Sequence, residues 1–139
     1  MELFIKRIRN GVKLPTKGSD GAGAYDVWMD GVTIQRKGDL LKACLGFATQ
    51  IPDGYVAKLY PRSSAGVKRG VKLANTVGII DSDYRGEWAA FFYADPDIDF
   101  DGHDRLFQFT IEKVESPIII EVDKLPETKR GGGAFGSTG

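Results

Sequence analysis

Short runs in which apolar and polar residues alternate recur along this chain of 139 residues, separated by glycine and proline. A period of two is typical of half-buried β-strands. No segment carries an apolar stripe of period 3.6 over three helical turns, and only one short helix, around Ala65–Arg69, is predicted. The segments predicted as strands are MELFIKRI, VTIQ, LLKACLGFATQI, YVAKLY, EWAAFFYA, LFQFTIEKV and the β-branched run IIIEV.

Turn signals separate these predicted strands. They are Asp30-Gly31, Lys37-Gly38-Asp39, Pro52-Asp53-Gly54 and Ser116-Pro117. Many short strands at regular spacing predict an all-β fold, a jelly-roll-like β-sandwich or barrel. We expect one β domain over residues 1–122, followed by a flexible, glycine-rich C-terminal arm over residues 123–139.

Composition and charge narrow the possible partners. The chain has 19 Lys and Arg against 19 Asp and Glu, so nothing general favours binding to a nucleic acid polymer, and any affinity for phosphate must be local. Its single cysteine, Cys44, excludes an intrachain disulfide and suits a reducing compartment. No apolar run approaches the roughly 20 residues of a membrane helix, and no signal peptide is evident. We expect a cytoplasmic protein that does not enter a membrane.

Two polar segments could carry chemistry. In the loop PRSSAG after YVAKLY, the fork of donors on Arg62 and the neighbouring serine hydroxyls would suit a phosphate chain; a solvated surface turn is the alternative. In Asn75–Glu87, the carboxylate of Asp81 follows an apolar strand and could orient and deprotonate a water. The alternative there is a hairpin tip whose aspartates cap their own turn.

Three further features are weaker. Asp26 lies in the predicted strand between Tyr25 and Val27, where a carboxylate could hold a metal through water or simply face outward. The tail carries an arginine and an aromatic residue on glycines, which fits either a lid or a disordered terminus. The Asp-rich loop Asp95–Asp104 matches half of an EF-hand but has Gln108 at position twelve, so a solvated loop is predicted.

Taken together and in order, five segments resemble the five motifs of the homotrimeric, all-β deoxyuridine triphosphate nucleotidohydrolase (dUTPase) family. They are AYDVW, PRSSAG, NTVGIIDSDYRGE, DRLFQF and RGGGAFGSTG. The resemblance spans most of the chain, and the third and fifth segments are its most specific parts. It implies a homotrimer with shared active sites that uses Mg²⁺ to hydrolyse dUTP to dUMP and pyrophosphate. Ala134 departs from the pattern, because glycine usually precedes the aromatic residue of the fifth motif.

The resemblance also implies a role for each matched residue. Asp81 would activate the attacking water, and Tyr84 would lie under the deoxyribose and exclude a 2′-hydroxyl. Asp26 would position Mg²⁺ through water. Uracil would be read by Asn75 and by the backbone of Gly78, Ile79 and Ile80. The phosphates would be held by Arg62, Ser63, Ser64 and Gln108, and the arm of a neighbouring subunit would close the site with Arg130, Phe135, Gly136 and Ser137.

Two other functions remain open. A dCTP deaminase would share the fold and similar motifs, but its chemistry needs an acid shortly after the third motif, where this chain has Phe91. A regulatory trimer would bind dUTP without hydrolysing it, since a fold does not fix a function.

Overall fold

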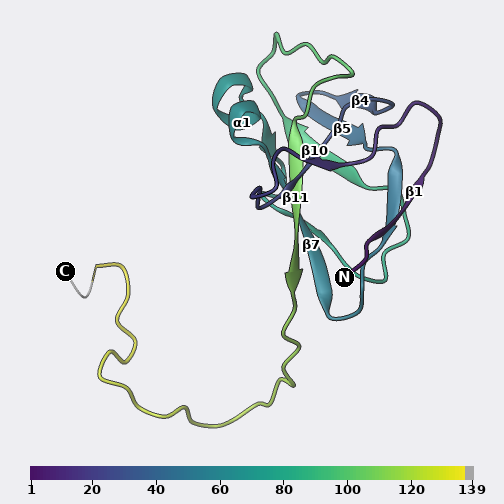
Figure 1. The fold of residues 1–139 in the computed structure, drawn as a ribbon. Helices are drawn as coiled ribbons and strands as arrows, with labels where there is room; N and C mark the ends of the chain where they lie inside the picture. Colours follow the sequence, from purple (N-terminus) through teal and green to yellow (C-terminus); the bar gives the residue numbers. More distant parts are fainter. Residues whose placement is uncertain (137–139) are drawn as a thin grey trace.

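The computed structural model describes residues 1–136 as eleven short β-strands and one helix (Figure 1). Those in the first half are β1 (Phe4–Arg7), β2 (Thr16–Lys17), β3 (Tyr25–Val27), β4 (Thr33–Lys37), β5 (Leu40–Cys44) and β6 (Phe47–Gln50). The rest are β7 (Tyr55–Pro61), α1 (Ser63–Arg69), β8 (Lys72–Leu73), β9 (Gly78–Ile80), β10 (Ala89–Tyr93) and β11 (Phe107–Lys113). None of the described residues form a helix long and apolar enough to span a membrane.

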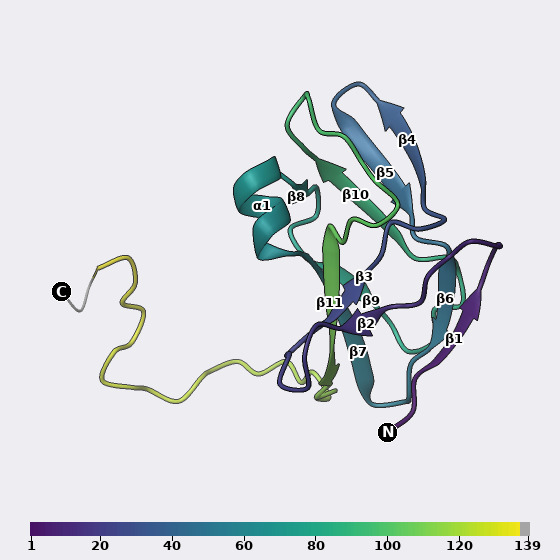
Figure 2. The ribbon, with the colours of Figure 1, turned by 45° about the horizontal axis from the view of Figure 1, so that its top comes forward.

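The strands form three antiparallel sheets. A five-stranded sheet has the order β2-β3-β11-β7-β9, a four-stranded sheet has the order β4-β5-β10-β8, and β1 pairs with β6 (Figures 1 and 2). Strands that are distant in the sequence are often neighbours in a sheet, as when β11 lies between β3 and β7. The predicted all-β, jelly-roll-like sandwich is therefore confirmed, and it is an open sandwich rather than a closed barrel over the described residues.

Aromatic side chains join the sheets into one core. Phe92 of the four-stranded sheet packs edge-to-face on Phe107 of the five-stranded sheet, with ring centroids 5.2 Å apart. Trp88, which immediately precedes β10, lies 5.0 Å from both Phe47 and Phe109, measured between ring centroids, and so links the two-stranded and five-stranded sheets. Such contacts add to the large apolar area that each ring buries. The sandwich therefore has a rigid base on which polar residues of the outer faces can be positioned.

Most strand and turn predictions are confirmed. The predicted turns at Gly31, Gly38 and Gly54 have φ of 73°, 59° and 83°, a region that favours glycine. The predicted strand LLKACLGFATQI is wrong as a continuous strand, because Gly46 has φ of 84° and divides it into β5 and β6. The apolar pattern continues through the break because both halves bury their side chains in the same core.

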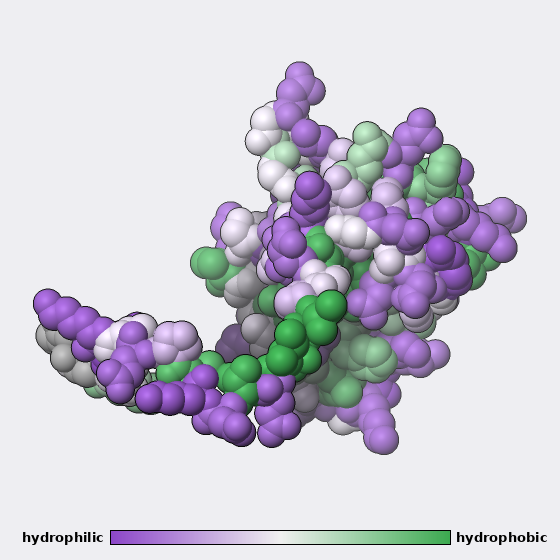
Figure 3. Space-filling view, turned by 90° about the horizontal axis from the view of Figure 1, so that it is seen from below, coloured by the Kyte–Doolittle hydropathy of each residue, from purple (hydrophilic) through white to green (hydrophobic). Residues whose placement is uncertain are grey.

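The predicted strand IIIEV is wrong as well. After β11 the chain leaves the sandwich and runs away from it (Figures 1 and 2). Ile118, Ile119 and Ile120 are among its most exposed large apolar residues, and Figure 3 shows an apolar stretch where the chain leaves the sandwich. A strand needs a partner for its backbone N–H and C=O groups, and this run pairs with no strand of its own chain among residues 1–136.

Candidate active site

One corner of the five-stranded sheet is held by ion pairs around Asp26. Arg62 Nε lies 3.1 Å from Oδ1 of Asp26, and Arg105 donates from Nη1 to Oδ2 at 3.0 Å. Asp26 is only 7% exposed, and a buried carboxylate without partners would be strongly disfavoured. Asp26, Arg62, Arg105 and Gln108 are called the Asp26 corner below.

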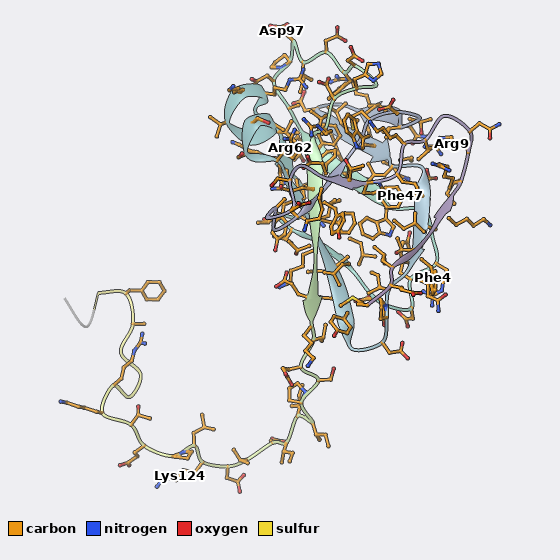
Figure 4. All side chains as sticks on the ribbon, viewed as in Figure 1. Phe4, Arg9, Phe47, Arg62, Asp97 and Lys124 are labelled. Carbon is orange, nitrogen blue, oxygen red and sulfur yellow. The ribbon has the colours of Figure 1, made fainter. Side chains whose placement is uncertain are left out.

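The strand register explains why these side chains meet. Gln108 of β11 lies directly opposite Asp26 of β3, and residues paired in this way point to the same face of a sheet. Phe107 and Phe109 are buried in the core, so alternation places Gln108 on the outer face. Arg62 follows β7, the other neighbour of β11, and its Nη1 donates to the backbone oxygen of Arg105 at 3.1 Å. Figure 4 labels Arg62 at this corner.

Beside this corner lies a small pocket of about 170 Å³ with a basic lining. The predicted phosphate ligands Ser63 and Ser64 are exposed at the beginning of α1, and Ser64 lines the pocket. Its one acid, Asp104, is paired with a guanidinium, 3.1 Å from Arg69 Nη1. This excess of donors and positive charge suits an anion. The basic residues of the lining are Arg62, Lys68, Arg69 and Arg105.

The acidic side chains at this corner fit a magnesium ion only if it is held through water. Among residues 1–136 there is no group of three or more His, Cys, Asp and Glu side chains that could hold a metal. Each Asp26 oxygen faces one guanidinium group, and a carboxylate offers about four acceptor positions. Positions therefore remain for metal-bound water. The site fits a Mg²⁺ that keeps its waters and takes its remaining ligands from substrate phosphates, as is common for this ion.

The opposite corner carries the Asn75–Glu87 segment, called the Asp81 corner below. Gly78 packs so closely against β7 that a Cβ there would lie 3.0 Å from the Cβ of Leu59, so glycine lets the hairpin approach the sheet. Thr76 has φ of 66°, and Asn75 donates from Nδ2 to the backbone oxygen of Val77 at 3.3 Å. These contacts fold the hairpin back on itself and leave its tip exposed.

The Asp81 side chain itself is exposed. No ion pair within residues 1–136 involves Asp81, whose backbone oxygen accepts the N–H of Tyr84 at 3.2 Å. A surface depression of about 380 Å³ adjoins this carboxylate and is also lined by Ile79 and Ser82. The hydroxyl of Tyr84 donates to the backbone oxygen of Glu87 at 3.0 Å. The carboxylate is therefore free to accept a hydrogen bond from a water.

The strand register keeps the two corners apart. β11 and β7 lie between β3 and β9, which makes three strand spacings, or about 14 Å. Along the strands, Gln108 of β11 is paired with Asp26 of β3. Ile111 of β11 is paired with Ala57 of β7, which is paired in turn with Ile80 of β9. Asp81 lies one residue further, so the Cα atoms of Asp26 and Asp81 are roughly 20 Å apart. One chain presents two halves of the predicted site but does not join them.

Between the corners, the outer face carries charged side chains outside the predicted site. Glu112 accepts a hydrogen bond from the Thr110 hydroxyl at 2.9 Å and lies 3.3 Å from Lys58 Nζ. The hydrogen bond from Thr110, together with the hydrogen bond and positive charge of Lys58, lowers the pKa of Glu112, although desolvation opposes this.

The predicted arm residues lie away from both corners in this single chain (Figure 1). Arg130 donates from Nε to the backbone oxygen of Gly133 at 2.7 Å, within the arm itself. Phe135 is fully exposed, and Gly136 has φ of 88°. Ser137 lies outside the described residues. Up to residue 136, the arm therefore contacts neither the Asp26 corner nor the Asp81 corner of its own chain.

Arg105 is the residue of the Asp26 corner that the motifs did not predict as part of the site. Its guanidinium shares Asp26 with Arg62 and also lies 4.8 Å from the centroid of the Trp28 ring. A signal was present, since Arg105 belongs to the DRLFQF segment that contains Gln108.

Comparison with known proteins agrees with this geometry. The sequence model of the dUTPase family matches residues 10–139. The chain belongs to the dUTPase family. Among family members, a deoxyuridine 5′-triphosphate nucleotidohydrolase of Hydrogenobaculum sp. (strain Y04AAS1) is 34% identical over 142 residues, covering 100% of this chain and 99% of the relative. The enzyme of the same name from Kluyveromyces lactis is 39% identical over 132 residues, covering 91% and 86%.

Solved structures of dUTPases share the fold. A mutant dUTPase of Staphylococcus bacteriophage 80alpha with dUpNHpp has a TM-score of 0.84 at 18% identity, covering 99% of this chain and 98% of that one. A mutant dUTPase of phage phi11 of S. aureus, described with a structural Mg(II) ion, has a TM-score of 0.77 at 17% identity, covering 91% and 100%. At these identities the likeness establishes the dUTPase fold alone.

Proposed function

We propose that this chain hydrolyses dUTP to dUMP and pyrophosphate. The observation that carries the proposal is its full-length match to deoxyuridine 5′-triphosphate nucleotidohydrolases, combined with an exposed carboxylate at Asp81 beside a surface depression. Family membership indicates the reaction, and the two corners carry the residue types that this reaction needs.

The chemistry divides between the two corners. The triphosphate is strongly negative. Arg62 would neutralise part of this charge, and Ser63, Ser64 and Gln108 would donate hydrogen bonds that orient the phosphates. Asp81 would orient the attacking water and accept its proton, so that the water approaches the α-phosphorus in line with the departing pyrophosphate. Bound Mg²⁺ would stabilise negative charge on the phosphates. Asp26 would hold a water of that ion while its ion pairs keep Arg62 in place.

Recognition of the nucleoside belongs to the hairpin. Asn75 carries both a donor and an acceptor, and the backbone of Gly78, Ile79 and Ile80 offers further groups for the edge of uracil. Tyr84 would lie under the deoxyribose and leave no room for a 2′-hydroxyl. Rejection of an analogue is strongest where a buried polar group would lose its partner, which favours uracil over cytosine in such a hairpin.

The distance between the corners supports a trimer with shared active sites. A general base must lie within about 3 Å of the water proton that it accepts, so Asp81 cannot serve phosphates bound roughly 20 Å away in the same chain. The Asp81 corner of one subunit would meet the Asp26 corner of its neighbour. Repeating the same contact around a threefold axis would close the assembly and form three identical sites.

The arm would complete each site from a neighbouring subunit. In this arrangement residues 1–122 form the body, and residues 123–139 form the arm. The exposed run of isoleucines before the arm lacks a strand partner within the described part of its own chain, which is consistent with contacts to another subunit. Arg130 would reach the terminal phosphate, Phe135 would stack on uracil, and Gly136 and Ser137 would close over the ligand.

The test is product formation from separate nucleoside triphosphates with Mg²⁺. We expect pyrophosphate from dUTP and much less from dTTP, dCTP and UTP. Ammonia from dCTP would instead establish the deaminase. The sequence disfavours that activity, because Phe91 stands where the deaminase needs an acid, and its ring contacts Lys42 on an outer face of the four-stranded sheet. Tight dUTP binding without any turnover would establish a regulatory protein and overturn the proposal.

A further inference from the structure

Arg9 ties together three segments that are distant in the sequence. Its Nε donates to the backbone oxygen of Gly31, its Nη2 to that of Cys44, and its Nη1 to Oε1 of Glu87, each at 2.7 Å. Figure 4 labels Arg9 on the side of the sandwich away from Arg62. A planar guanidinium holds several acceptors in a fixed geometry that a lysine cannot reproduce. This arrangement therefore fixes the position of Glu87.

Glu87 is held from a second side as well. Its Oε1 also accepts the backbone N–H of Gly46 at 2.9 Å. The next residue, Trp88, is buried and donates its N–H to the backbone oxygen of Phe47 at 2.9 Å. Both the side chain of Glu87 and the backbone that follows it are therefore restrained, and the direction of the Glu87 carbonyl group is restrained with them.

That carbonyl group is what holds Tyr84. The Tyr84 hydroxyl donates to the Glu87 backbone oxygen at 3.0 Å, and its ring lies so close to Gly86 that a Cβ on Gly86 would collide with it. Tyr84 is otherwise half exposed, so few apolar contacts restrain the ring. Its position depends on the hydrogen bond to Glu87 and on the space that Gly86 leaves.

We propose that Arg9 is a positioning residue for sugar selection, acting through Glu87 on Tyr84. The inference rests on the proposed function, in which the Tyr84 ring lies under the deoxyribose. A ring with a fixed hydroxyl excludes the 2′-hydroxyl of a ribonucleotide. A ring released from Glu87 can move aside and admit it. Arg9 lies outside the five motifs and just before the region that the family model matches.

The first test compares dUTP with UTP for the parent protein, Arg9→Ala, Arg9→Lys and Glu87→Gln. Loss of a hydrogen bond to a charged group is large enough to change a ratio of kcat/KM values by about tenfold. We expect the preference for dUTP over UTP to fall by about that factor in Arg9→Ala, mainly because UTP gains. Arg9→Lys should recover part of the preference, and Glu87→Gln should lose part of it.

Arg7→Ala is the matched control. Arg7 is also an N-terminal arginine, but its Nε donates to the backbone oxygen of Val12 at 3.0 Å, and it has no hydrogen bond to Glu87 among the described residues. Its removal should leave the dUTP preference unchanged. If Arg9→Ala lowered only the melting temperature and kept the parent's preference, Arg9 would be merely structural and the proposal would fail. If Arg9→Ala did not fold, Arg9→Lys and Glu87→Gln would decide the question by the same ratio.

A second test asks whether the effect passes through the Tyr84 hydroxyl. In a Tyr84→Phe background, Arg9→Ala should cause no further loss of preference, because the link is already broken. Additive losses would overturn the proposed route. Affinities for non-hydrolysable imido analogues of dUTP and UTP, measured by calorimetry, should follow the same pattern. These affinities test Arg9 even if the parent proved not to hydrolyse dUTP, so failure of the inference is distinguishable from failure of the proposed function.

Discussion

The Asp26 corner and the Asp81 corner lie on the same five-stranded sheet but are built in opposite ways. At the first, Asp26 is buried between two guanidinium groups. At the second, the Asp81 side chain is exposed and forms no ion pair within residues 1–136. The first corner is preorganised by the fold of one chain, so it can hold a rigid charged group without further rearrangement. The second is incomplete until something else covers it.

This contrast has a physical reason. Phosphate binding needs fixed positive charges, which a chain can stabilise internally by pairing them with a buried carboxylate. A carboxylate that accepts a proton must instead keep an open side for water.

Asp81→Asn should abolish most turnover. An amide cannot accept the proton of the attacking water, and general base catalysis commonly contributes 10²–10⁴-fold, so we expect kcat to fall by about 1000-fold. Because the amide keeps the shape of the side chain, affinity for a non-hydrolysable dUTP analogue should change little. Pyrophosphate release and calorimetry measure the two quantities. Turnover at the parent rate would exclude Asp81 as the base.

Mixing two inactive chains should restore activity if subunits share sites. Asp81→Asn carries an intact Asp26 corner, and Arg62→Ala carries an intact Asp81 corner. After co-refolding at equal amounts, about a quarter of the sites in random trimers would combine two intact corners. Against the roughly 1000-fold loss expected for Asp81→Asn, activity should rise roughly 250-fold above that variant alone. No recovery in confirmed mixed trimers would mean that both corners act within one chain.

Removing residues 130–139 should reduce turnover by about tenfold to 100-fold, because the arm would exclude water and add a phosphate ligand. The oligomer should persist, since the deleted residues lie beyond the isoleucine run. Light scattering and pyrophosphate release measure the two properties. A fully active truncated protein would contradict the role of the arm as a lid.

The same substitution should affect stability differently at the two corners. Asp26→Asn leaves two arginines without their carboxylate, so we expect a loss of about 2 kcal/mol in the free energy of unfolding. Asp81→Asn removes no ion pair, and its change should stay within about 0.5 kcal/mol. Urea unfolding of both variants measures this difference. Equal losses would mean that the Asp81 corner is also preorganised.

The smallest effect is expected at Glu112, between the corners. Its folded-state pKa is lowered by the Thr110 hydroxyl and by Lys58, so its stabilising contribution is present above the unfolded-state pKa and is lost as pH falls through the lowered value. Glu112→Gln should therefore be slightly less stable than the parent near neutral pH, and this difference should vanish in strongly acidic buffer. Glu121→Gln, in the exposed segment after β11, is the matched control. Thermal unfolding across pH measures it, and a difference that grew towards acid would have the wrong sign.

Local patterns determined the strands, the turns and the residue types of the site. Alternation identified β7, β10 and β11, because one face of each strand is buried in the core. Glycines marked the turns at Gly31, Gly38 and Gly54, because their backbone angles are unfavourable for other residues. The five motifs, read together, indicated the family and the proposed residues of both corners.

Only the tertiary structure decided which of those residues meet. The pairing of β11 with both β3 and β7 brings Gln108 opposite Asp26 and places Asp81 far away. The same pairing revealed Arg105 as the second partner of Asp26, and the fold brought Arg9 to Glu87 across 78 residues of sequence. The isoleucine run showed the limit of local patterns, because β propensity alone does not supply a partner strand. Local motifs identify which residue types a site can use, whereas long-range strand pairing sets the distances between those residues.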